Sequence, residues 1–136
     1  FKNIDFYNDS KSTNVNSAKT AIKSFKNIFW ILGGREKKGG LNGIEKYLGN
    51  ILQAYVYGEC SENFKTFLVK NSITCLKFKT LKESFNQALK DAIKQKININ
   101  ILLSPACSSF DQFNNFEDRG KKFKQLVSEK IKTSDI

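Results

Sequence analysis

Hydrophobic and polar positions follow two alternating patterns along this chain. Five short apolar runs, rich in Ile, Val, Phe and Tyr, have the length and composition of buried strands. They lie at Ile4–Tyr7, Ile28–Leu32, Ile51–Tyr57, Ile73–Phe78 and Ile97–Leu103. Because strands that are apolar on both sides must be covered on both faces, these runs predict a mostly parallel sheet inside the molecule.

Amphipathic segments lie between the apolar runs. Apolar residues recur at helical spacing within Ala18–Phe25, Leu81–Ile93 and Phe116–Ile131, while Leu41–Leu48 and Ser61–Lys70 are weaker helix candidates. Strand and helix therefore alternate about five times, which is typical of right-handed crossovers. This order predicts the α/β class, as a Rossmann-like three-layer domain with a mostly parallel sheet of about five strands and helices on both faces.

Length and composition fit one soluble domain. A chain of 136 residues can build one compact core, so we expect a single domain over residues 1–136. Hydrophobic residues make up 40% and charged residues 26%, and no apolar run approaches the ~20 residues of a membrane span. Because methionine is absent and no leader pattern opens the chain, we expect a piece of a longer protein, with no membrane partner.

The net charge of +10 raises the possibility of nucleic acid as a partner. However, all but two of the 23 basic residues are lysines, and they are spread over every segment. A bias towards lysine explains this charge at least as well, so we expect no nucleic acid, and a basic nucleic-acid-binding module is the alternative from a different class. Three widely spaced cysteines with no histidine fit neither a disulfide framework nor a metal site, and they favour a cytoplasmic location.

Three loops that follow predicted strands carry most of the polar chemistry. Ligands of parallel sheets bind at the carboxyl ends of strands, where helix N-termini also lie, so we expect these loops on one rim with Lys11, Lys37 and Ser109 around one cleft. The first loop, "NDSKSTN" at 8–14, offers an anion site at a helix start. Taken alone, it is better explained as a capped helix with a solvated lysine.

The other two loops differ in how strongly they indicate a ligand. "GGREKKGG" at 33–40 is as compatible with a simple turn as with a ligand arm, and it matches neither a P-loop nor a dinucleotide fingerprint. "SPACSSFDQFNNFEDRG" at 104–120 has too many hydrogen-bonding groups for an ordinary connector. We expect Phe110, Phe113 and Phe116 to give this loop a core of its own, and a rigid polar loop suits a small polar ligand.

These three motifs, with "YGE" at 57–59, resemble the C-terminal domain of the Mur ligase family, and within it the members that add D-glutamate. The long "SPACSSFDQFNNFEDRG" run carries most of that resemblance, which covers essentially the whole chain. It implies that an initial strand and the family's N-terminal and central domains lie outside this sequence. Another Mur ligase or a folylpolyglutamate-type ligase is the alternative within the same class.

The resemblance implies ATP-dependent amide formation in peptidoglycan precursor synthesis. The carboxylate of UDP-N-acetylmuramoyl-L-alanine is phosphorylated, and the amine of D-glutamate then displaces the phosphate. ATP and Mg²⁺ would be held mainly by a central domain, so the chain alone is expected to be inactive and, in the intact enzyme, monomeric. By the same similarity Asp9 would contact the ATP ribose, and Lys11 would face the phosphates in a catalytic role.

The remaining site residues follow from the same resemblance. One group would hold the α-carboxylate of D-glutamate and another its side-chain carboxylate, and neither group would bind a metal. A dianion whose amine must attack needs two separated anion holders and no strong base. Lys38 is the alternative to Lys37 as the ligand arm. The α-carboxylate residues are Thr13 and Lys37, and the side-chain carboxylate residues are Ser109, Phe110 and Phe116.

Overall fold

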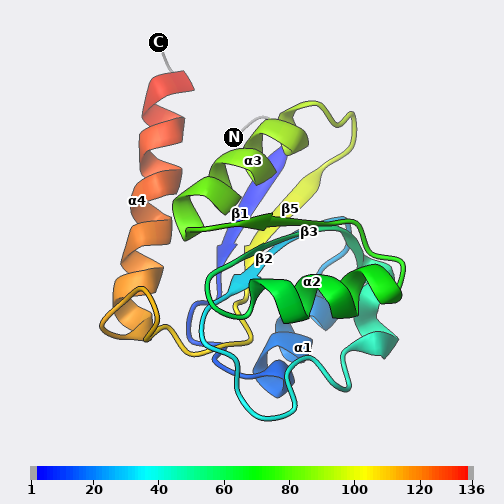
Figure 1. The fold of residues 1–136 in the computed structure, drawn as a ribbon. Helices are drawn as coiled ribbons and strands as arrows, with labels where there is room; N and C mark the ends of the chain where they lie inside the picture. The colour runs from blue at the N-terminus through cyan, green and yellow to red at the C-terminus, as the bar shows by residue number, and fades with distance from the viewer. Residues whose placement is uncertain (1–2, 135–136) are drawn as a thin grey trace.

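The computed structural model describes residues 3–134, in which five strands form one sheet (Figure 1). Every pairing between these strands is parallel, and the strand order is β1-β5-β2-β3-β4. The predicted α/β class and mostly parallel sheet are therefore confirmed. The strands are β1 Ile4–Asn8, β2 Ile28–Gly33, β3 Ile51–Tyr57, β4 Cys75–Phe78 and β5 Ile99–Leu103.

Helices cover both faces of this sheet, as the sequence predicts (Figure 1). Helices α1 and α2, with the short 3-10 helix η1, pack on one face, while α3 and α4 pack on the other. Among the helices of residues 3–134, none combines the length and the hydropathy needed to cross a membrane. The helices are α1 Val15–Ser24, η1 Glu45–Asn50, α2 Ser61–Lys70, α3 Leu81–Ile93 and α4 Phe116–Ser134.

Strand β2 shows how one apolar run serves two cores. All six of its residues are buried, and successive side chains enter opposite layers because side-chain direction alternates along a strand. Trp30 belongs to the core under α1 and α2, while Ile31 belongs to the core under α3 and α4. The indole Nε1 of Trp30 donates a hydrogen bond of 2.8 Å to the Ser104 carbonyl, so the only tryptophan is also tied to the end of β5.

The helix predicted at Leu41–Leu48 is confirmed only in its second half. Residues 41–43 form a turn, and the 3-10 helix Glu45–Asn50 overlaps the predicted range at residues 45–48. Within the predicted range, Gly43 has a φ of 97°, which an α-helix does not accommodate. The apolar residues that suggested one α-helix, Leu41, Ile44 and Leu48, are instead buried against the core from the turn segment and from η1.

The core under α3 and α4 depends on a buried aromatic group. The fully buried Phe85 ring lies 5.7 Å from that of Phe123 in an edge-on arrangement and 6.0 Å from that of Phe6. Phe85→Ala should lower the free energy of unfolding by about 3–5 kcal/mol, because it leaves a cavity in close-packed surroundings. Phe110→Ala is the matched control, since Phe110 is 63% exposed. Urea denaturation followed by tryptophan fluorescence measures both, and equal losses would contradict this account of the core.

Candidate functional site

The loops that follow β1, β2 and β5 meet at the carboxyl edge of the sheet. The amide of Ala106 donates to the Ser12 carbonyl at 3.0 Å, which joins the β5 loop to the β1 loop. Arg35 and Ser108 exchange two backbone hydrogen bonds of 3.1 Å, which join the β2 and β5 loops. The prediction that the three polar loops share one rim is therefore confirmed.

Lys37 and Thr13, from different loops, are brought into contact on this rim. The Lys37 ammonium donates to the Thr13 hydroxyl at 3.1 Å, and both side chains reach solvent. Asn14 follows directly and caps α1 by accepting from the Ser17 amide at 2.9 Å. An ammonium and a hydroxyl therefore lie at the positive end of a helix, which suits a carboxylate. Of the two neighbouring lysines, Lys37 is the one whose ammonium contacts Thr13.

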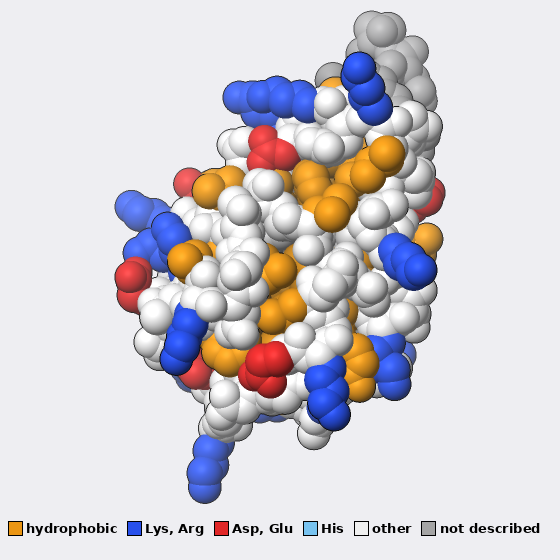
Figure 2. Space-filling view, turned by 90° about the vertical axis from the view of Figure 1, so that its right-hand side faces the viewer, with side chains coloured by type: hydrophobic (Ala, Val, Ile, Leu, Met, Phe, Trp, Pro, Cys, Tyr) orange, Lys and Arg blue, Asp and Glu red, His pale blue; other side chains and the backbone are white. Residues whose placement is uncertain are grey.

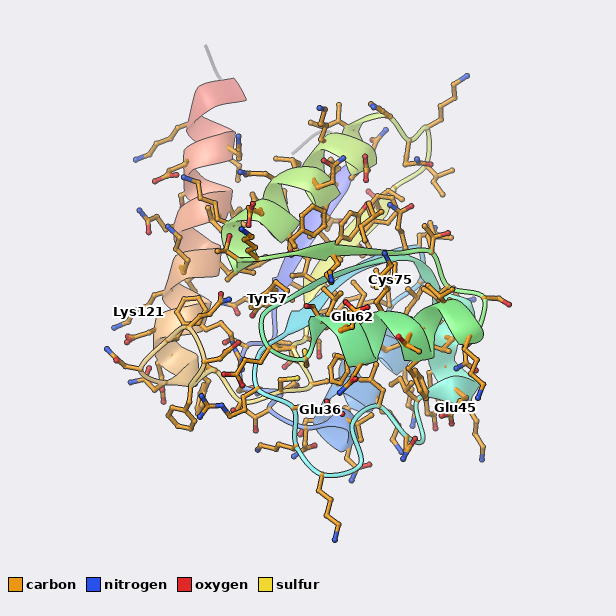
Figure 3. All side chains as sticks on the ribbon, viewed as in Figure 1. Glu36, Glu45, Tyr57, Glu62, Cys75 and Lys121 are labelled. Carbon is orange, nitrogen blue, oxygen red and sulfur yellow. The ribbon has the colours of Figure 1, made fainter. Side chains whose placement is uncertain are left out.

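Asp9 and Lys11 occupy the β1 side of the rim. The Asp9 carboxylate accepts from the Ser104 hydroxyl at 2.9 Å and also from the Ser12 hydroxyl, so its orientation is fixed. Lys11 is exposed and lines a hollow of about 300 Å³ beside the start of α4. Lys121, which projects from α4, lines the same hollow (Figure 3). This side of the rim therefore combines one held carboxylate with several ammonium groups.

The β5 loop differs from the prediction in where its side chains lie. Phe110 is 63% exposed and Phe116 is 39% exposed, so the expectation that phenylalanines give this loop its own core is wrong. The small side chains of Ala106 and Cys107 occupy the interior instead. Ser109 is only 2% exposed, so it lies beneath the rim surface and does not emerge beside Lys11 and Lys37 as expected.

Phe116 is the first residue of α4, and its position matters more than its ring. The first amides of a helix have no intrahelical acceptor, so they point towards the rim as donors. Asn115 caps the helix by accepting from the Asp118 amide at 2.8 Å. The carbonyl of Ser109 closes a turn by accepting from the Phe113 amide at 2.8 Å. This loop therefore presents a second helix N-terminus, separate from that of α1, although the first turn of α4 also carries Glu117 and Asp118.

Arg119 is a site residue that the sequence analysis did not identify. Its side chain is wholly buried, and it donates to the Ser10 carbonyl at 2.6 Å, the Ser10 hydroxyl at 2.9 Å and the Cys107 carbonyl at 3.0 Å. Burial lowers the pKa of this guanidinium below its ordinary value. The sequence did contain one sign of this role. All but two of the basic residues are lysines, so an arginine at this position suggests that several N–H donors in a fixed geometry are needed there.

Two buried cysteines, Cys75 and Cys107, have thiols that their surroundings keep protonated. A hydrogen bond to Cys60 and burial raise the pKa of the Cys107 thiol, and burial raises the pKa of Cys75 to about 12. Burial also raises the pKa of Tyr57, at the end of β3 (Figure 3). These groups stay neutral at ordinary pH, so the site chemistry belongs to the lysines, hydroxyls and helix amides.

Comparison with known proteins agrees with this arrangement, although no family model matches the chain. The chain is 44% identical over 98% of its length to a UDP-N-acetylmuramoylalanine–D-glutamate ligase of Wolbachia sp. subsp. Brugia malayi (strain TRS). The corresponding values are 46% over 93% for a ligase of the same name from Rickettsia conorii (strain ATCC VR-613 / Malish 7), and 38% over 92% for one from Caulobacter vibrioides (strain NA1000 / CB15N).

These matches cover 26%, 25% and 26% of the three relatives, so the chain spans about a quarter of the length of the curated relatives it matches. The matched part is their C-terminal part. Together with the fold, these similarities show that the chain matches the C-terminal domain of Mur ligases. Among Mur ligases, it matches the D-glutamate ligase.

The double glycine after β2 gives a test of how tightly the loops are joined. Gly34 has a φ of 131°, and a Cβ there would lie 2.2 Å from the Ser108 carbonyl oxygen. Gly34→Ala should therefore lower the free energy of unfolding by at least about 1–3 kcal/mol. Gly49→Ala is the control, because a Cβ at Gly49 would meet no heavy atom within 4 Å. Urea midpoints measure the difference, and equal midpoints would show that the β2 and β5 loops are not closely packed.

Proposed function

We propose that this chain is the amino-acid-binding C-terminal domain of an ATP-dependent ligase that joins D-glutamate to UDP-N-acetylmuramoyl-L-alanine in peptidoglycan precursor synthesis. The observation that carries the proposal is the 3.1 Å contact between Lys37 and Thr13, which assembles a carboxylate holder from two loops. The similarity over 91–98% of the chain to proteins named as D-glutamate ligases supports the same reading. The single-domain assignment to residues 1–136 is part of this proposal.

D-glutamate fits the two helix ends on this rim. Its α-carboxylate would accept from the Lys37 ammonium and the Thr13 hydroxyl at the start of α1. Its side-chain carboxylate would accept from the backbone amides at Phe110 and Phe116 and from Ser109, which at 2% exposure would lie at the floor of that position. Charge-assisted hydrogen bonds of this kind fix both ends of the ligand. The amine would remain without a charged partner and free to attack.

The β1 side of the rim suits the nucleotide and the developing charge. The Asp9 carboxylate, held by two serine hydroxyls, would accept hydrogen bonds from the ribose hydroxyls of ATP. The exposed Lys11 ammonium would stabilise negative charge that grows as the D-glutamate amine attacks the activated carboxyl group. Within residues 3–134 no group of three or more His, Cys, Asp or Glu side chains could hold a metal ion. MgATP, which supplies the phosphoryl group, would therefore be held mainly by other parts of the ligase.

Two further parts of the proposal concern surroundings and partners. We place the ligase in the cytoplasm, because the domain has buried free cysteines and the proposed reaction consumes ATP. We also propose that the ligase is a monomer. A nucleic-acid-binding module is less favoured, because Figure 2 shows basic side chains scattered singly over the face it presents. Such a module would need a contiguous positive groove with exposed aromatic rings.

Steady-state kinetics of a complete ligase that contains this chain test the proposed roles. Lys37→Ala should raise the KM for D-glutamate about tenfold to a hundredfold with little change in kcat, because it removes one contact to a carboxylate that does not react. Lys11→Ala should lower kcat and leave that KM nearly unchanged, because its charge is needed as the transition state forms. Lys38→Ala is the matched control with no expected effect.

Three outcomes would contradict the proposal. If the complete ligase shows no D-glutamate-dependent phosphate release, the proposed function is wrong. If Lys38→Ala raises KM as much as Lys37→Ala does, the proposed role of the Lys37–Thr13 contact in carboxylate binding is wrong. A rise in KM alone for Lys11→Ala would move Lys11 from the chemical step to ligand binding.

A further inference from the structure

Arg119 is unusual because its buried positive charge has no carboxylate partner among residues 3–134. Arg35 pairs with Glu59 and Lys77 pairs with Glu62, and both of these ion pairs are exposed. The hydrogen bonds from the Arg119 guanidinium to Ser10 and Cys107 all go to uncharged oxygens. The carboxylate of Asp111 acts on the Arg119 charge without an ion pair to it, so this buried charge has no direct ionic partner.

Keeping an unpaired charge in the interior is unfavourable, and the lowered pKa of Arg119 reflects this. An apolar side chain would fill the same space without that cost. Three well-directed bonds to two loops need the fixed fork of a guanidinium, which lysine cannot reproduce. We therefore relate the hydrogen bonds and the charge of Arg119 to the rim loops that it joins.

The two bonded residues belong to the two ligand-bearing loops. Ser10 lies between Asp9 and Lys11. Its hydroxyl, which accepts from Arg119, donates in turn to the Phe116 carbonyl at 2.7 Å. Cys107 lies two residues before Ser109. A second connection runs alongside, because the Asn8 amide donates to the Gly120 carbonyl at 3.1 Å. One side chain thus links the β1 loop, the β5 loop and the first turn of α4.

We propose that Arg119 is a positioning residue of the ligation site, an inference that rests on the proposed function. It fixes the spacing between the nucleotide side of the rim and the D-glutamate side. Its unpaired charge also adds positive potential beneath a site that receives anions, because charge interactions are weakly screened inside a protein. Loss of Arg119 therefore weakens binding of D-glutamate and ATP together, although it touches neither.

The test uses the complete ligase with Arg119→Lys and Arg119→Gln, and it measures KM for each substrate together with kcat. Arg119→Gln removes the charge and the fork, so KM for D-glutamate should rise about tenfold and KM for ATP should rise with it. Arg119→Lys keeps the charge, so part of the D-glutamate effect should be rescued. Arg35→Lys, at the only other arginine, is the exposed control and should leave both KM values unchanged.

The KM values separate positioning from simple stabilisation. A variant that only reduces the folded fraction lowers apparent kcat and leaves KM unchanged. If the Arg119 variants do not fold, Ser10→Ala replaces them, since it removes only the hydroxyl that joins Arg119 to Phe116. It should raise KM for D-glutamate about threefold, a smaller effect than the loss of a charge-assisted bond.

Each result has a distinct meaning. Raised KM values for both substrates with an unchanged Arg35→Lys control support the inference. Unchanged KM values in the Arg119 variants, or in Ser10→Ala where the Arg119 variants do not fold, overturn it and leave the proposed function intact. A wild-type complete ligase without D-glutamate-dependent activity overturns both.

Discussion

The position of β5 between β1 and β2 decides which loops of this molecule meet. All the described strands are parallel, so their carboxyl ends lie at one edge of the sheet. Because β5 is hydrogen-bonded to both β1 and β2, the long loop after it is held between the other two. That placement allows Ala106 to bond to the β1 loop and Ser108 to pair with the β2 loop. The rim is therefore a consequence of strand order.

The chemistry of the rim follows from two helix ends and a few cations. Helices α1 and α4 both begin there, and each offers donors to an anion. The raised pKa of the Cys107 thiol beneath the rim keeps that thiol neutral, so it offers no thiolate nucleophile there. Such a site can orient a dianion and stabilise charge, which is what a domain that presents D-glutamate to an activated carboxyl group must do. The similarity to the C-terminal part of D-glutamate ligases is consistent with this division of labour.

The sequence was most informative where periodicity and burial agree. The helix at Ser61–Lys70 and the strand at Ile51–Tyr57 have the predicted bounds, because their apolar spacing matches the faces they bury. Prediction failed in the first half of Leu41–Leu48, where the positive φ of Gly43 overrides apolar spacing.

The candidate site was predicted only in part, for two reasons. Which phenylalanines of the β5 loop are buried depends on neighbours that only the fold provides. The Lys37–Thr13 contact and the bonds from Arg119 to Ser10, on which the proposed roles rest, join residues distant in sequence. A resemblance to a family suggests such roles, but local physics cannot derive them.

A crystal structure of a complete ligase that contains this chain, with D-glutamate bound, tests the central claim most directly. The account predicts one carboxylate within hydrogen-bonding distance of the Lys37 ammonium and the Thr13 hydroxyl. The other carboxylate should face the Ser109 loop and the first amides of α4, with the amine directed away from both. D-glutamate bound away from this rim, or with both carboxylates at one helix end, would contradict the account.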